Sequence, residues 1–188
     1  MPVPDRRVQR TRKTLHQALM SLVVEKPYDA ITVQEVLDRA DIGRSTFYTH
    51  FRDKDELLMS GVRELHTTLS NAQSATKGPE SILAFSRAMF EHAQQFRKVY
   101  HALVTTSVWP HVQQRVRNVL ADLVRRECAT QLKSSRSKVP PELFIHYVSA
   151  TMMAVLTWWV DHRNALSAEE IDDVFRALVM PAMRSVLR

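Results

Sequence analysis

Glycine and cysteine are scarce in this chain of 188 residues, which has three glycines and a single cysteine, Cys128. Few glycines, together with plentiful Ala, Leu, Arg, Glu and Gln, favour helices over turn-rich β structure. A single cysteine excludes a disulfide framework within the chain and is typical of a reducing compartment. The composition therefore predicts an all-α protein of the cytoplasm.

Long apolar runs are also missing. The longest one, from Met152 to Val160, is much shorter than the ~20 residues that a membrane span requires. The N-terminal stretch Met-Pro-Val-Pro-Asp-Arg-Arg is not followed by the apolar segment of a secretory signal. We expect no membrane association.

Motifs of catalysis and metal binding are absent. The eight histidines are scattered, with no HExxH spacing and no CxxC-like pair. There is no G-x-S-x-G elbow, no phosphate-cradling glycine loop and no dinucleotide fingerprint. We therefore expect no enzymatic activity, no metal site and no cofactor.

The net charge of +6 suits a nucleic-acid partner, but its distribution does not identify one. A basic run near the N-terminus suits a phosphate backbone. A second group of cations, between residues 115 and 138, is interpreted as a solvated helix face. The basic run comprises Arg6, Arg7, Arg10, Arg12 and Lys13.

The most informative stretch spans residues 30–54. Thr32 and Glu35 have the spacing of a capping box, which predicts the start of a short helix. Asp41-Ile42-Gly43 is a turn, because Gly and Asp both tolerate left-handed backbone angles. Phe47 and Phe51, four residues apart, anchor a second helix whose opposite side is small, polar and cationic. Two short helices at this spacing form a helix-turn-helix, a DNA-reading unit.

The motif Ser45-Thr-Phe-Tyr-x-His-Phe-x-x-Lys-x-x-Leu57 resembles the DNA-binding domain of the TetR/AcrR family of transcriptional regulators. The chain departs from the family pattern at Asp41, where Gly is usual, and at Gly43, where Ser or Thr is common. The resemblance implies that the helix from about Gly43 to His50 enters a DNA major groove, and that a homodimer reads a palindromic operator. It implies base contacts by Gln34, Arg44, Ser45 and Thr46, and phosphate contacts by Thr32, Tyr48, Thr49, His50 and Lys54.

The hydrophobic periodicity predicts about nine helices in two domains. Residues 1–53 form the three-helix DNA-binding head, and residues 54–188 form a larger helical domain for effector binding and dimerisation. The first helix is expected from about Arg6 to Glu25. A helix capped by Asp53 runs towards Ala72, and a helix opened by Gly78-Pro79 reaches about Thr106, with a possible break near Gln95. A further break is expected at Trp109-Pro110, a later helix runs from Pro140-Pro141 to about His162, and the last helix is capped by Ser167 and Glu170.

The helix from Glu142 to Val160 has two apolar stripes, more than one core face requires. Either it is the central helix of a monomeric bundle, or its second stripe packs with the last helix against another subunit. We favour the dimer, as the family resemblance also implies. The predicted interface comprises Leu143, Tyr147, Ala150, Ala154, Trp158, Val174 and Leu178.

The resemblance also implies an effector pocket inside the larger domain. A small, mostly apolar molecule would lie among Met89, Phe90, His92, Phe96, Tyr100, Trp109, Met152 and Trp159. The alternative is that these residues are simply core.

Two functions follow from the resemblance. The first is a homodimeric repressor released from DNA by this effector. The second is an adaptor or coactivator controlled by a protein partner. It rests on the segment Trp158-Trp-Val-Asp-His…Leu166-Ser-Ala-Glu-Glu-Ile…Phe175, which resembles the C-terminal domain of a subgroup that includes regulators controlled by a metabolic enzyme.

Overall fold

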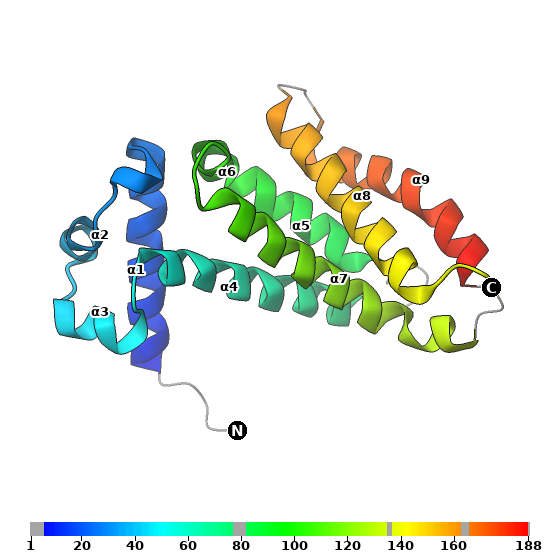
Figure 1. Cartoon of the computed structure of the whole chain (residues 1–188), viewed down its shortest axis with the longest axis horizontal. Helices are drawn as coiled ribbons and strands as arrows, with labels where there is room; N and C mark the ends of the chain where they lie inside the picture. The colour runs from blue at the N-terminus through cyan, green and yellow to red at the C-terminus, as the bar shows by residue number, and fades with distance from the viewer. Residues whose placement is uncertain (1–5, 77–81, 135–136, 163–165, 188) are drawn as a thin grey trace. The chain divides into compact units, whose positions relative to one another are not determined.

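The computed structural model describes residues 6–76, 82–134, 137–162 and 166–187, which form α-helices joined by short connections (Figure 1). Within these ranges there are nine α-helices and no strand, which confirms the all-α prediction. The elements are α1 (Arg6–Glu25), the 3-10 helix η1 (Tyr28–Ala30), α2 (Val33–Ala40), α3 (Arg44–His50), α4 (Lys54–Ala75), α5 (Ala84–Gln95), α6 (Arg97–Leu103), α7 (Trp109–Ser134), α8 (Pro141–Asp161) and α9 (Ala168–Val186).

The chain divides into two compact units. The first contains residues 1–64 and 98–112, and the second contains residues 65–97 and 113–188. The first unit is therefore larger than the head of residues 1–53 expected from sequence, because it includes the start of α4, all but one residue of α6 and the first turn of α7.

The core of the first unit is built on α1. The predicted apolar stripe of this helix is buried as expected, and Pro27, directly after Lys26, cannot continue it. Val36 from α2, Phe47 from α3 and Leu57 from α4 complete the core, each with no exposed surface. The stripe comprises Leu15, Ala18, Leu19, Leu22 and Val23.

The helix-turn-helix has the local chemistry that its sequence predicts. The capping box at the start of α2 is complete: Glu35 N donates to Thr32 Oγ1 at 3.3 Å, and Thr32 N donates to the Glu35 carboxylate at 2.9 Å. Asp41 ends α2 with φ 53° and ψ 49°, whereas Gly43 precedes α3 with an ordinary φ of −67°. The left-handed residue of the turn is thus Asp41, a residue type that tolerates this conformation.

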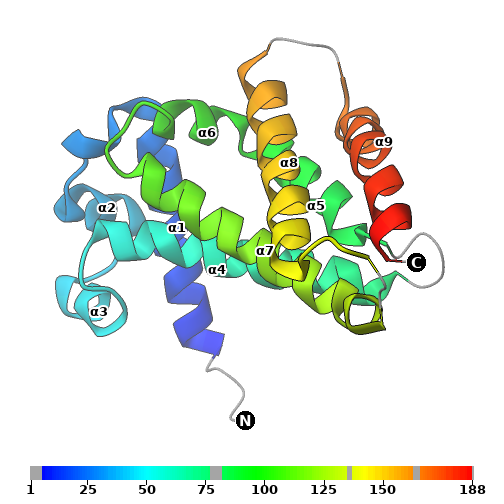
Figure 2. The ribbon, with the colours of Figure 1, turned by 45° about the vertical axis from the view of Figure 1, so that its right-hand side comes forward.

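The second unit has an aromatic centre formed by α5, α8 and α9 (Figure 2). The Phe90 ring meets Trp159 edge-on at 5.8 Å and Phe175 at 6.2 Å between ring centroids. All three side chains are almost fully buried. α8 is long and apolar enough to cross a membrane, but 56% of its most apolar stretch is buried inside the protein, which is the pattern of a core helix.

The helix expected to open at Gly78-Pro79 and to reach about Thr106 is shorter and divided. The expected break near Gln95 is present, because α5 ends at Gln95 and α6 begins at Arg97. The start is at Ala84, because Leu83 adopts a left-handed backbone with φ 57°. Glu127 accepts a hydrogen bond from Leu83 N at 2.6 Å, and Arg176 donates to Leu83 O at 3.0 Å, so both backbone polar groups of Leu83 are held. The predicted opening at Gly78-Pro79 lies outside the described residues.

Besides Pro141, which is the first residue of α8, two prolines of the described residues lie inside helices. Trp109-Pro110, interpreted from sequence as a break, forms the first turn of α7, where a missing N–H does no harm. Pro181 lies within α9 and leaves the carbonyl of Ala177 without its usual donor four residues on. The Tyr147 hydroxyl of α8 donates to the next carbonyl, Leu178 O, at 3.2 Å. The Ser167–Glu170 capping box of α9 is present as predicted.

Candidate nucleic-acid interface

One side of α3 is apolar and packs on the core of the first unit, and the opposite side is polar and faces solvent. Phe47 is completely buried and Phe51, which ends the helix, is 2% exposed. These two rings attach α3 to the core of the first unit, so its other side faces outward. The exposed residues of that side are Arg44, Ser45, Thr46, Tyr48 and Thr49, all of which were predicted to contact DNA.

Arg44 and Tyr48 form a pair at the surface. The Arg44 guanidinium lies 6.0 Å from the centroid of the Tyr48 ring, within range of a cation–π interaction. Tyr48 also meets the buried Phe47 ring edge-on at 5.3 Å. The Arg44 side chain therefore lies near a half-exposed aromatic ring that contacts the buried Phe47, and its planar fork suits a bidentate contact with guanine.

The other predicted contact residues have partners within the chain. Thr49 Oγ1 donates to Ser45 O at 2.9 Å, and Gln34 Nε2 donates to Asp38 Oδ1 at 2.8 Å. Thr32 contributes its hydroxyl to the capping box of α2. His50 is half-buried, with its ring 6.4 Å from that of Phe51. A DNA contact by the Gln34 amide would therefore replace or share an existing hydrogen bond.

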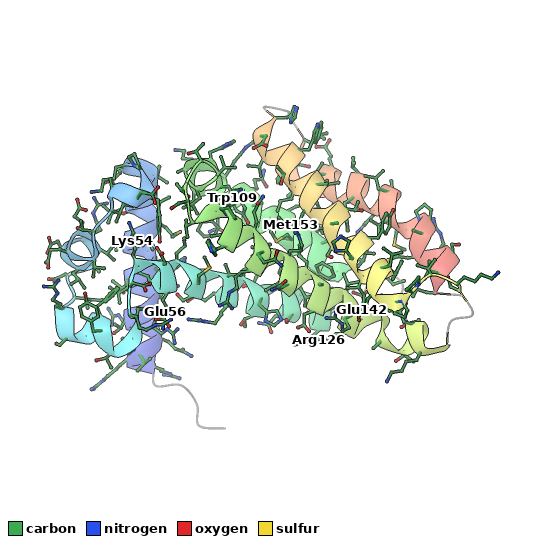
Figure 3. All side chains as sticks on the ribbon, viewed as in Figure 1. Lys54, Glu56, Trp109, Arg126, Glu142 and Met153 are labelled. Carbon is green, nitrogen blue, oxygen red and sulfur yellow. The ribbon has the colours of Figure 1, made fainter. Side chains whose placement is uncertain are left out.

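Lys54, labelled in Figure 3, has a different set of partners from the phosphate predicted by sequence. Its ammonium donates to Tyr28 O and Ile31 O, each at 2.8 Å, and to Asp29 O at 3.3 Å, and it lies 4.6 Å from the Tyr28 ring centroid. An ammonium has three N–H donors, so every donor of Lys54 has a carbonyl acceptor within the chain. This arrangement favours a role in joining α4 to η1 over a role in holding DNA.

Two further polar contacts connect α2 and α4 of the helix-turn-helix region to residues 26 and 28, which precede α2. The Tyr28 hydroxyl donates to Asp55 Oδ1 at 2.5 Å, and burial together with this carboxylate raises the pKa of Tyr28. Lys26 forms an ion pair with Glu35, and this contact together with the Thr32 hydrogen bonds lowers the pKa of Glu35 to about 2. Sequence analysis missed the Tyr28–Asp55 contact, because a spacing of 27 residues carries no periodic signal.

The residues proposed to line an effector pocket do not form a single cluster in one unit. Met89, Phe90, Met152 and Trp159 are buried in the second unit, where Phe90 and Trp159 pack against each other. His92 and Phe96 are half-buried there, with ring centroids 4.6 Å apart. Tyr100 and Trp109 belong to the first unit and meet edge-on at 5.9 Å.

The residues proposed for a dimer interface form an exposed apolar face on α8 and α9. Leu143 is 57% exposed, Trp158 47% and Leu178 53%. Tyr147, Ala154 and Val174 are also exposed, and Ala150 is half-buried. Within one subunit, this second stripe of α8 is therefore not part of the core.

Among the described residues, no group of three or more His, Cys, Asp or Glu side chains is placed to hold a metal ion. The chemistry of the first unit is that of hydrogen-bond donors and cations on a short exposed helix. Such a helix recognises base edges and phosphates.

The chain is similar in sequence to known transcriptional regulators. A family profile described as bacterial regulatory proteins, tetR family, matches residues 15–60, and a transcriptional regulator C-terminal region matches residues 80–181. YhgD of Bacillus subtilis (strain 168), an uncharacterised HTH-type transcriptional regulator, is 25% identical over 189 residues, covering 92% of this chain and 96% of YhgD. YxbF of the same organism, with the same description, is 27% identical over 168 residues, covering 86% of this chain and 42% of YxbF. This chain therefore spans less than half the length of YxbF.

A solved structure shows the same fold. The crystal structure of a TetR transcriptional regulator from Streptococcus agalactiae 2603V superposes with a TM-score of 0.67 at 24% identity, covering 93% of this chain and 96% of the other. These relatives are transcriptional regulators rather than enzymes. With a helix-turn-helix whose outer side is polar and cationic, and with family matches over both parts of the sequence, the chain belongs to the TetR family of DNA-binding bacterial transcriptional regulators.

Proposed function

We propose that the protein is a homodimeric repressor that reads a palindromic operator through α3 and is released by a small, mostly apolar effector. The observation that carries the DNA-reading part is the exposed row of Arg44, Ser45, Thr46, Tyr48 and Thr49 on a helix fixed by buried Phe47 and Phe51. Arg44, Ser45, Thr46 and Gln34 contact bases, and Thr32, Tyr48, Thr49 and His50 contact phosphates.

The homodimer is supported by the exposed apolar face of α8 and α9. Leu143, Trp158 and Leu178 leave about half of their surface in water in a single subunit. Large exposed apolar patches are rare on monomers and mark interaction sites. A second copy that packs the same two helices would form a four-helix interface with two-fold symmetry.

The effector is supported by the fold and by the ligands of structural neighbours. SmeT, 18% identical with a TM-score of 0.67, was solved with triclosan, and RolR, 18% identical with a TM-score of 0.60, with resorcinol. Both ligands are aromatic. The aromatic and Met side chains of the second unit suit a molecule of this kind, since Met adapts to irregular cavities.

The second candidate is a coactivator of the same fold that is controlled by a protein partner. It is favoured by a structural neighbour, the dihydroxyacetone kinase operon activator DhaS, 18% identical with a TM-score of 0.68. It is also favoured by the segment from Trp158 to Phe175. Operator binding by dialysed protein alone supports the repressor, whereas binding that needs a second protein supports the coactivator.

The DNA-reading part is tested by selecting duplexes from a random pool with purified protein. The repressor hypothesis predicts enrichment of a palindrome, and Arg44→Ala lowers discrimination between that duplex and random DNA by ~1–3 kcal/mol if Arg44 reads guanine. Arg115→Ala, an exposed arginine of α7, is the control and leaves discrimination unchanged. Absence of any enriched sequence, or an Arg44 variant with unchanged discrimination, contradicts the proposal.

A further inference from the structure

The first turns of α1 carry a concentration of positive charge that the helix-turn-helix does not use. Residues 6–13 include five Arg or Lys and no Asp or Glu. The first turn of the helix has no acidic residue. Like charges gathered on one short segment repel one another, so a segment of this kind is favoured when an anionic partner is present.

Three of these cations lie on one side of the helix. Arg6, Arg10 and Lys13 follow the i, i+4, i+7 spacing that aligns side chains along one face. All three are exposed, and the face that they form is opposite the buried stripe that contains Leu15 and Leu22. None of the three forms an ion pair with any residue in the described ranges.

The end of α1 that carries these three cations lies beside the DNA-reading helix within the first unit. The Arg12 guanidinium is 5.1 Å from the centroid of the Phe51 ring, and Phe51 is the residue that ends α3. Figures 1 and 2 both show the N-terminal end of α1 next to α3, at the same end of the unit. The basic turns of α1 and the polar side of α3 are therefore neighbours.

We propose that Arg6, Arg10 and Lys13 bind phosphate groups of the DNA backbone next to the base pairs read by α3. The inference rests on the proposed DNA-reading role of α3 and extends the interface to a second helix. The partner is DNA rather than an acidic protein, because the three cations lie at the end of α1 that adjoins a helix with DNA-reading chemistry. Contacts with phosphate carry no base information, so this surface adds affinity and fixes orientation without adding sequence preference.

The test is the salt dependence of binding to a fluorescent 30-base-pair duplex of random sequence, on the order of the site length of a dimer that spans successive major grooves. The triple variant Arg6→Gln, Arg10→Gln, Lys13→Gln removes the charge and keeps residues that favour helix. Each lost phosphate contact lowers the log–log salt slope by about 0.9, so the slope falls by up to ~2.7 for each bound subunit. Discrimination between a selected operator and random DNA stays as in the unmodified protein.

A matched triple variant controls for net charge. Lys98→Gln, Arg115→Gln, Lys133→Gln removes the same number of exposed cations from α6 and α7 and leaves the slope nearly unchanged. An unchanged slope in the α1 variant, or equal losses in the two variants, overturns the inference while DNA binding itself stands. Loss of binding to an acidic protein but not to DNA would assign the face to a protein partner and also overturn it. Unmodified protein that binds no duplex at all would instead contradict the proposed function.

Discussion

At the scale of single residues, Gly61 in α4 shows how closely the first unit is packed. A Cβ atom at this position would lie 2.2 Å from Nε2 of His16 and 3.0 Å from its Cε1. Gly61→Ala therefore displaces the imidazole and lowers the free energy of unfolding by ~1–3 kcal/mol, the usual cost of overpacking.

The effect of Gly61→Ala on the free energy of unfolding should reverse in sign when the His16 imidazole is removed. In a His16→Ala background, Gly61→Ala no longer meets the ring, and the better helix propensity of Ala stabilises α4 by up to ~1 kcal/mol. Urea unfolding of the four proteins in this double-mutant cycle measures both values. Destabilisation by Gly61→Ala in both backgrounds would show that another neighbour limits the space.

His16 also gives the first unit a pH dependence. Burial lowers the pKa of His16 below its usual value of about 6.5, and the nearby Glu64 carboxylate only partly offsets this. The unfolded chain then binds a proton that the folded chain does not, so stability is full above about pH 6.5 and falls as the pH drops towards the folded pKa. Between about pH 7.5 and about pH 5.5, the melting temperature should fall further for the unmodified protein than for His16→Gln. Equal falls in the two proteins would contradict this account.

Lys54 gives a test of structural against DNA-binding roles. Lys54→Met removes three hydrogen bonds to backbone carbonyls of residues 28–31, and we expect a loss of ~2–3 kcal/mol in the stability of the first unit. Lys98→Met, at an exposed position, is the control. Normal stability combined with a salt slope of DNA binding lowered by about 0.9 would instead restore the phosphate role predicted from sequence.

At the scale of elements, Arg97 closes the end of α8. Its Nη2 donates to the carbonyls of Trp159, Val160 and His162 at 3.2, 3.1 and 2.6 Å. Its guanidinium lies 5.9 Å from the Trp159 ring centroid. The first two carbonyls belong to the last turn of α8, where carbonyls lack partners within the helix, and the third belongs to His162, the residue that follows it.

Replacement of Arg97 should loosen that end of α8 and little else. Arg97→Gln removes the charge and the donor fork, and amide hydrogen exchange at residues 158–162 should become faster, with a loss of ~1–2 kcal/mol in local stability. Lys98→Gln, the next residue, is the control. Exchange that rises equally throughout α8 would mean that Arg97 supports the whole unit rather than one helix end.

The elements that could be read from sequence are those whose signals are local. α1 follows from the apolar stripe around Leu15 and Leu19 and from Pro27, and the exposed side of α3 follows from the spacing of Phe47 and Phe51. The start of α5 could not be read, because Leu83 is held by Glu127 and Arg176, which lie 44 and 93 residues away. The partners of Lys54 lie 23 to 26 residues away in sequence, so the motif could not indicate these hydrogen bonds.

At the scale of the whole molecule, the proposed dimer depends on the exposed face of α8 and α9. Ala154→Arg places a charge in the middle of the proposed dimer interface, where an unpaired buried charge costs roughly 3–5 kcal/mol. The dissociation constant should rise by about 100-fold or more. Sedimentation at micromolar concentration measures the change, with Asn71→Arg on the exposed side of α4 as the control. An unmodified protein that sediments as a monomer would contradict the dimer.

The lone cysteine has a practical consequence for studying this molecule. Cys128 is 1% exposed, and burial together with Glu127 raises the pKa of its thiol to about 12. Because the thiolate is the reactive form, Cys128 should be silent towards maleimide dyes at neutral pH. Any cysteine placed at an exposed position of α3, such as Ser45→Cys, then becomes the unique attachment point in each subunit. Energy transfer between the two dyes of a dimer would report the separation of its two reading helices directly, with and without DNA.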